Sequence, residues 1–231
     1  MDGIKKQAIG SFTLALIGTA ALLTLTRVIG QQQQNNIWLY GVYQAITLAV
    51  AFVVIILMRV LKGGQLNYLQ QGDLKASTQP IPLLAVKKTD NWRNTGITFA
   101  LITAVATGAY LFFAYRAQLA GVELSGWLLA LVVGIPLALT NSFTEGIVTR
   151  WTIAEGFTGS LSPYAPWVSA LIFGIVHYFG IPGGWAGSLM AGFLAWLLVR
   201  SIQDTRGIAW SWFIHFCLDV LIFTVTIALF I

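Results

Sequence analysis

The sequence has few charged residues and a single cysteine. Only 9% of its 231 residues are charged, against roughly 25% in an ordinary globular chain, which excludes a soluble fold. Cys217 has no second cysteine to pair with, so an intrachain disulfide framework is excluded too. Apolar side chains are abundant instead: 57% of residues are hydrophobic and the mean hydropathy is +0.78. This composition indicates a chain whose main solvent is lipid.

Uncharged apolar runs predict the first membrane crossings. Residues 7–26, 37–58 and 94–115 form three such runs, each close to the ~20 residues that a helix needs to span a bilayer. The first run is longer than a signal-peptide core and no clear cleavage site follows it, so we expect a retained helix rather than a cleaved signal peptide. The polar segment QQQQNN at residues 31–36 is expected to be a water-exposed connection between the first and second crossings.

The remaining crossings follow from the second half of the chain. A fourth begins near Ser125, with Pro136 as an expected kink. Residues 156–199 carry no charge and suffice for two crossings if FGIPGG at 179–184 makes the turn. A seventh begins near Ile208 and runs to the last residue. We therefore predict an all-α polytopic transmembrane helical bundle of seven helices, or eight if residues 61–88 contain a short embedded piece.

The basic residues predict the orientation. With a cytoplasmic N-terminus, the outer loops hold only Arg27 and Arg116, which satisfies the positive-inside rule. We expect an integral protein of a prokaryotic cell membrane, with no basic surface left over for nucleic acid. The inner segments hold ten basic residues: Lys5, Lys6, Arg59, Lys62, Lys75, Lys87, Lys88, Arg93, Arg200 and Arg206.

One long polar stretch divides the chain. Residues 63–92 form an inner loop that is too short for a catalytic domain and is interpreted as a tether. We expect an N-terminal three-helix membrane region at 1–120 and a four-helix core at 121–231. Within the sixth crossing, Gly184, Ser188 and Gly192 recur at four-residue intervals, which favours close packing against a neighbouring helix.

Four ionisable residues fall inside predicted crossings: Glu145, His177, His215 and Asp219. A charge at the bilayer centre costs on the order of 3 kcal/mol on insertion scales, so each needs a partner or a purpose. A lone membrane histidine usually forms a helix–helix hydrogen bond. Four such groups on three helices, at depths that the helical rise allows to coincide, favour one shared site.

The helical spacing around these groups supports a common site. His215 and Asp219 are four residues apart, and Ser211 lies one turn earlier on the same stripe. Asn141, Glu145 and Thr149 make a similar polar stripe on the fourth crossing. Each stripe must face protein or water rather than lipid.

Three short motifs carry these residues in order: EGIVTR at 145–150, FGIVH at 173–177 and HFCLD at 215–219. Together they resemble the CAAX protease and bacteriocin-processing (CPBP, or Abi) family of intramembrane proteases, whose pattern is Glu-Glu-x-x-x-Arg, Phe-x-x-x-His and His-x-x-x-Asn or Asp. The resemblance covers roughly residues 121–231. It implies a membrane-embedded endopeptidase acting on a membrane-associated peptide or protein, which need not be prenylated.

The resemblance also implies roles for the residues. Glu145 corresponds to the general base that activates water, His177 to an assisting group, and His215 with Asp219 to an oxyanion-stabilising pair. An ionised Asp219 cannot donate a hydrogen bond, so we expect it to orient His215 instead. The supporting residues are Arg150, Phe173 and Asn141.

One position departs from the family pattern. Gly146 stands where the second glutamate is expected, so Arg150 has to pair elsewhere, with Glu155 or with lipid headgroups. The neighbours of that arginine, Thr149 and Trp151, also differ from the usual Phe and Gly. Gly146 therefore motivates an alternative, a catalytically inactive family member that serves as a membrane scaffold or regulator.

Two further alternatives concern the ionisable residues. Glu145, His177, His215 and Asp219 could relay protons in a coupled transporter, although no inverted repeat is apparent. Glu145, His177 and His215 could also ligate a catalytic zinc with an open fourth position. A helical His-Glu-x-x-His spacing is missing, so we expect a metal-free site without a cofactor.

Overall fold

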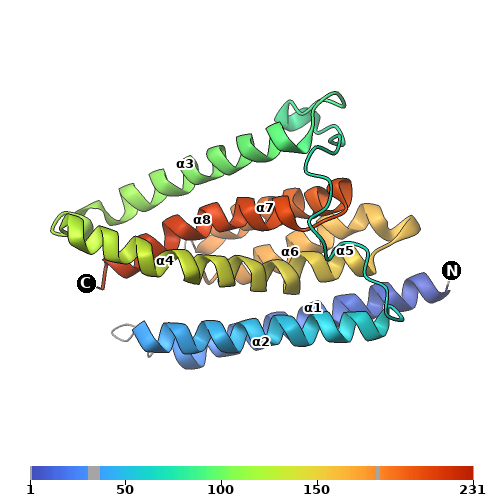
Figure 1. Ribbon diagram of the computed structural model, residues 1–231, viewed down its shortest axis with the longest axis horizontal. Coiled ribbons are helices and arrows are strands. Elements are labelled where there is room, and N and C mark those ends of the chain that lie inside the picture. Colours follow the sequence, from blue (N-terminus) through green and yellow to red (C-terminus); the bar gives the residue numbers. More distant parts are fainter. Residues whose placement is uncertain (1, 31–36, 181–182, 231) are drawn as a thin grey trace.

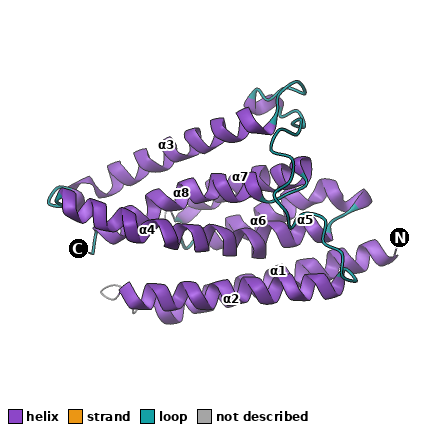
Figure 2. Ribbon diagram, in the orientation of Figure 1, coloured by secondary structure: helices purple, strands orange, loops and turns teal. Residues whose placement is uncertain are grey.

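The protein is built from helices joined by loops, and the part of the chain that is described contains no named strand (Figure 2). The computed structural model describes residues 2–30, 37–180 and 183–230. The connection at 31–36, part of the turn at 179–184 and the last residue lie outside the described residues. The helices are α1 (Asp2–Gly30), α2 (Ile37–Leu61), η2 (Pro82–Leu84), α3 (Trp92–Leu119), α4 (Leu124–Glu145), η3 (Gly146–Trp151), α5 (Thr152–Gly156), η4 (Gly159–Tyr164), α6 (Ala165–His177), α7 (Gly184–Thr205) and α8 (Ala209–Ala228).

Seven helical segments of the described chain are long and apolar enough to cross a membrane. They coincide with the seven predicted crossings, the fourth being a continuous span from Leu124 to Gly156 that contains Pro136. Residues 61–88 hold only the short helix η2, which gives no support to an eighth crossing. The chain is therefore an integral membrane protein with a polytopic helical bundle.

The long helices lie side by side in a flattened bundle (Figure 1). α1 and α2 pack together on one side, where α1 contacts α5 and α2 contacts α4. On the other side α3 packs on α8, and the pairs α4–α8 and α6–α7 fill the space between. The N-terminus and the α2–α3 connection lie at one end of the bundle, and the C-terminus lies at the other (Figure 1).

The outer surfaces of the helices are apolar. Val105 on α3 and Val132 on α4 are 71% and 69% exposed, which would be unfavourable in water but suits contact with lipid tails. The interior is closely packed around Trp151, which is fully buried together with Met58 and Ile153. Van der Waals packing of such residues holds helices together where lipid removes the hydrophobic driving force.

The α2–α3 connection is more than a tether, because it is folded against the ends of α5, α7 and α8. The fully buried carboxylate of Glu155 accepts hydrogen bonds from the backbone and side chain of Asn67 and from the backbone of Tyr68, at 2.8 to 2.9 Å. The carboxylate of Asp204 accepts a hydrogen bond of 2.9 Å from the indole of Trp92. These contacts fix the start of α3 against the end of α7.

α6 and α7 approach each other closely at glycines. A Cβ added to Gly174 would lie 2.9 Å from the carbonyl of Ser188, and one added to Gly192 would lie 3.1 Å from the carbonyl of Ala170. Ser188 and Gly192 of the predicted ladder are thus at the contact. The third member, Gly184, lies instead at the start of α7 with a φ of +65°, a conformation that favours glycine.

Candidate active site

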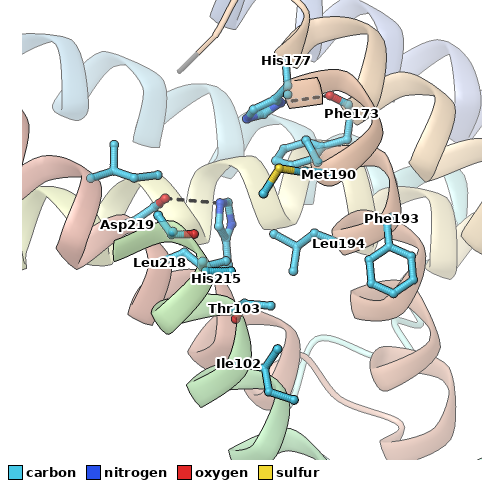
Figure 3. A pocket seen from close by; sticks show the side chains of 15 residues that line it. Ile102, Thr103, Phe173, His177, Met190, Phe193, Leu194, His215, Leu218 and Asp219 are labelled. Carbon is cyan, nitrogen blue, oxygen red and sulfur yellow. Dashed lines mark hydrogen bonds and ion pairs between the residues drawn. The ribbon is translucent and has the colours of Figure 1, made fainter. Parts of the chain in front are cut away.

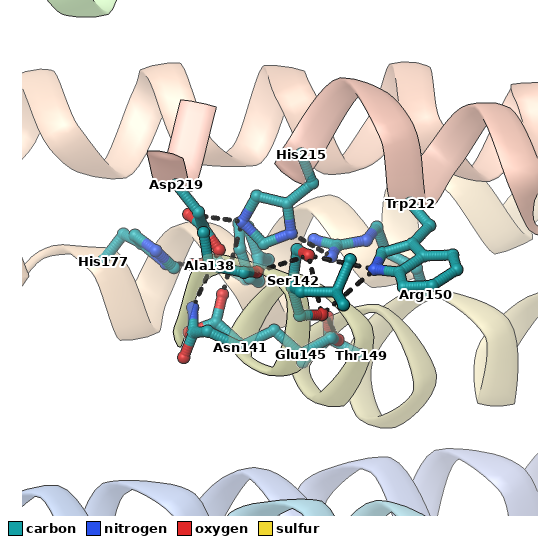
Figure 4. A network of polar contacts seen from close by, with 12 residues as sticks. Ala138, Asn141, Ser142, Glu145, Thr149, Arg150, His177, Trp212, His215 and Asp219 are labelled. Carbon is teal, nitrogen blue, oxygen red and sulfur yellow. Dashed lines mark hydrogen bonds and ion pairs between the residues drawn. The ribbon is translucent and has the colours of Figure 1, made fainter. Parts of the chain in front are cut away.

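The fourth span changes its helical geometry at the predicted site. Residues Gly146–Trp151 form a π-helix, in which hydrogen bonds join residues five apart, and the backbone N–H of Thr152 accordingly bonds to the carbonyl of Ile147. In a regular α-helix Glu145 and Arg150 would point about 140° apart. The wider turn of the π-helix brings residues five apart closer to one face, and both side chains reach the side of the span where α8 lies (Figure 4).

His215 lies at the centre of the polar cluster. Its Nδ1 is 2.5 Å from Nη2 of Arg150. Because a guanidinium can only donate, Nδ1 is the acceptor and the proton of the neutral ring is on Nε2. The other ring nitrogen, Nε2, is 3.5 Å from Oε2 of Glu145 and 3.4 Å from Oδ1 of Asp219 (Figure 4).

Asn141 fixes the second carboxylate. Its Nδ2 donates to Oδ2 of Asp219 at 3.0 Å, one turn before Glu145 on the same polar stripe of α4. Asp219 is buried, whereas the side chain of Glu145 keeps 25% exposure. Asp219 was expected to orient His215. In the structure Arg150 contacts Nδ1 of that ring, and Asp219 shares Nε2 with Glu145.

His177 lies at the end of α6 and is oriented by its own helix. Its Nδ1 donates to the carbonyl of Phe173 at 2.9 Å, so Nε2 is the acceptor of the neutral ring. The ring also packs on that of Phe173, with 4.1 Å between the centroids, and Phe173 meets His215 edge-on. Phe173 thus separates the two histidines and fixes their spacing.

Arg150 does not pair with Glu155 or with headgroups, as the sequence predicted. It is fully buried, lies over the ring of Phe173 and interacts electrostatically with Glu145 and Asp219. Glu155 is held by the α2–α3 connection instead. The Nε and Nη1 atoms of Arg150 have no hydrogen-bond partner among the described residues. A Cβ at Gly146 would lie 3.3 Å from Nη2 of Arg150, so the glycine leaves room beside the guanidinium.

A cavity of about 260 Å³ opens on the His215 side of the cluster, between α3, α6, α7 and α8 (Figure 3). His177, His215 and Asp219 bring polar groups to it, and Phe173 forms part of its wall. The rest of the lining is largely apolar, from residues such as Ile102, Met190, Phe193, Leu194 and Leu218. This volume suits an apolar segment of a substrate, delivered from the membrane.

The described residues do not form a metal-binding group. Within residues 2–30, 37–180 and 183–230, no three His, Cys, Asp or Glu side chains are close enough together to hold a metal ion. As they are arranged here, Glu145, His177 and His215 do not make up such a group.

Two supporting residues were not predicted from the sequence. The indole of Trp212 donates to the hydroxyl of Ser142 at 3.0 Å, which joins α8 to α4 one turn from His215 and Glu145 (Figure 4). The signal was present, since Trp212 lies three residues before His215 and Ser142 three before Glu145. Neither type is distinctive, however, in a chain with 9 tryptophans.

The fold and the cluster define an integral membrane protein with a group of ionisable side chains buried among its helices. The family model described as type II CAAX prenyl endopeptidase Rce1-like matches residues 125–221, from the start of α4 through Asp219 on α8. This match confirms the resemblance to the CAAX protease and bacteriocin-processing family and supports a CAAX-type intramembrane endopeptidase, a peptide hydrolase. No match was found among curated proteins or among solved structures.

Proposed function

We propose that the protein is an intramembrane endopeptidase that uses Glu145 as its general base. The observation that carries this proposal is the position of the Glu145 carboxylate, 3.5 Å from Nε2 of His215, a residue that lines the cavity that can hold substrate. Peptide hydrolysis needs a base, a water molecule and a donor aimed at the developing oxyanion. The cluster provides the base, Glu145, and the donor, Nε2–H of His215, in contact with each other.

The reaction uses these groups in two steps. Glu145 takes a proton from a water molecule as the oxygen of that water attacks the carbonyl carbon of the scissile bond. The carbonyl oxygen becomes an oxyanion. The Nε2–H of His215 donates to that oxyanion, in a ring whose tautomer is set by Arg150. Glu145 then gives its proton to the leaving nitrogen as the carbon–nitrogen bond breaks.

The other residues hold this arrangement or assist it. His177 presents the Nε2 acceptor of its ring and assists in moving the proton of the water. Asp219, held by Asn141, orients His215 by attracting its Nε2–H until substrate binds. Because the sequence lacks a helical His-Glu-x-x-His spacing, we assign every step to the protein's own side chains.

The substrate is proposed to be a membrane-associated peptide or protein, since the large cavity is mainly apolar and lies among the spans. The test compares the membrane-peptide profiles of cells that express the natural chain and Glu145→Gln. We expect fragments that appear only with the natural chain. Identical profiles, with equal amounts of both proteins in the membrane, would contradict the proposal and favour an inactive scaffold, the role that Gly146 motivates.

A further inference from the structure

A second, smaller cavity lies on the Glu145 side of the cluster. Its volume is about 60 Å³, and it is enclosed by α1, α2, α4, η3 and α6. Glu145 and Asn141 line it, and Phe173 and His177 border both this cavity and the large one. Much of the remaining lining consists of hydroxyl side chains from four elements: Thr19, Thr26, Tyr43, Thr47, Thr144 and Thr149.

Two of these hydroxyls are buried without a partner. Threonine hydroxyls in helices commonly bond to the carbonyl four residues earlier, as those of Thr26 and Thr149 do here. Thr19 and Thr144 are 7% and 1% exposed, yet their Oγ1 atoms have no hydrogen-bond partner among the described residues. Burying a hydroxyl in this way is unfavourable unless a water molecule supplies the missing bond.

The size and chemistry of the cavity fit water better than any part of a peptide. One water molecule needs roughly 10 to 15 Å³, so the space can hold more than one. A bound water usually makes two to four hydrogen bonds, and here Thr19, Thr144 and the Glu145 carboxylate all border the same space. The large cavity, with its apolar lining, is left for the substrate.

We propose that this cavity holds the water that Glu145 activates, and that the hydroxyls of Thr19 and Thr144 position it. The inference rests on the proposed function, and it extends the site to α1, which lies outside the residues that match the family. The water donates to the Glu145 carboxylate and accepts from a threonine hydroxyl. Water and substrate thus reach the reaction from opposite sides of Phe173 and His177.

The variants are Thr19→Val, Thr144→Val and the pair, which replace each hydroxyl by a methyl group of similar size. Thr224→Val is the matched control, because Thr224 on α8 also has a buried Oγ1 without a partner but does not line this cavity. We expect the double variant to lower kcat by ~10-fold with KM unchanged, less than the ~100-fold or more usual for an acid–base group, because these hydroxyls position the water and do not take its proton. The control should keep the natural kcat.

A second measurement detects the water without relying on activity. In a Glu145→Gln background, hydroxyl radicals produced by X-ray pulses should modify Tyr43, a side chain that lines the cavity. The double threonine variant should reduce this modification several-fold, and Thr224→Val should not. Unchanged modification of Tyr43 would overturn the proposal of a bound water. Reduced modification of Tyr43 together with a natural kcat would show a structural water and would overturn its role as the nucleophile. If the natural chain is inert and the modification changes as expected, the result counts against the proposed function alone.

Discussion

The two histidines of the site have opposite hydrogen-bonding roles. His215 carries its proton on Nε2, next to Glu145 and Asp219, and His177 presents an acceptor there because its Nδ1 donates to Phe173. We expect His177→Ala and His215→Ala each to lower kcat by at least ~100-fold, the usual contribution of one acid–base or oxyanion group. Turnover of purified protein provides the measurement, with Cys217→Ala on α8 as the control. A near-natural rate in either histidine variant would assign that residue a structural role.

A substitution at Gly146 tests whether the protein is an active enzyme or an inactive relative. A glutamate at this position would bring a carboxylate close to Arg150, whose Nη2 already bonds to His215. The ion pair would draw the guanidinium away from the histidine, so we expect Gly146→Glu to leave activity unchanged or to reduce it. Gly146→Ala, which adds only the Cβ, is the matched control. If the natural chain is inert and Gly146→Glu starts cleavage, the protein is a disabled relative.

The residues of the site could be predicted from the sequence, but some of their partners could not. Ionisable groups are costly inside a membrane, so Glu145, His177, His215 and Asp219 stood out by their location alone. The partner of Arg150 depends on how α8 lies against the π-helix, which no local spacing encodes. The sequence therefore suggested Glu155, five residues away, or lipid headgroups, whereas the structure places His215 beside the guanidinium.

At the scale of the helices, the close approach of α6 and α7 positions Phe173 and His177. We expect Gly174→Leu to force the two helices apart, because its Cβ would already lie 2.9 Å from the carbonyl of Ser188. Overpacking of this kind costs about 1 to 3 kcal/mol. The Tm in detergent should fall, and Gly41→Leu, where an added Cβ meets nothing within 4 Å, should leave it unchanged. Equal Tm values for both variants would contradict this packing.

The extents of the helices were largely predictable, and their local geometry was not. Charged residues and turns limit each apolar run, so the fourth span was expected to begin near Ser125 and begins at Leu124. The π-helix at Gly146–Trp151 has no residue signature of its own. Within it Arg150 and Trp151 are fully buried, in a packing arrangement that the sequence pattern does not contain.

For the whole molecule, the distribution of basic residues predicts a cytoplasmic N-terminus. The α2–α3 connection lies at the same end of the bundle as the N-terminus (Figure 1). In a Cys217→Ala background, a cysteine at the exposed Ser77 should therefore react only with a reagent that reaches the inner face. Gly121, between α3 and α4, should give the opposite result. Labelling of Ser77→Cys from outside would reverse the orientation.

The division into an N-terminal region at 1–120 and a core at 121–231 stays a proposal, and the packing gives the first region a purpose. α1 and α2 close the small cavity beside Glu145, and α3 forms a wall of the large one. The residues that match the family thus hold the proposed reacting groups, and the helices before them complete both cavities.

The most direct test of the glutamate mechanism measures peptide cleavage by the purified protein in lipid vesicles containing a strong chelator. Glu145→Gln is nearly isosteric and removes only the base, so the variant should insert and keep the Tm of the natural chain. The account predicts that the natural chain cleaves its peptide in the chelator and that Glu145→Gln does not. Cleavage by Glu145→Gln, or activity that disappears in the chelator and returns with zinc, would contradict it.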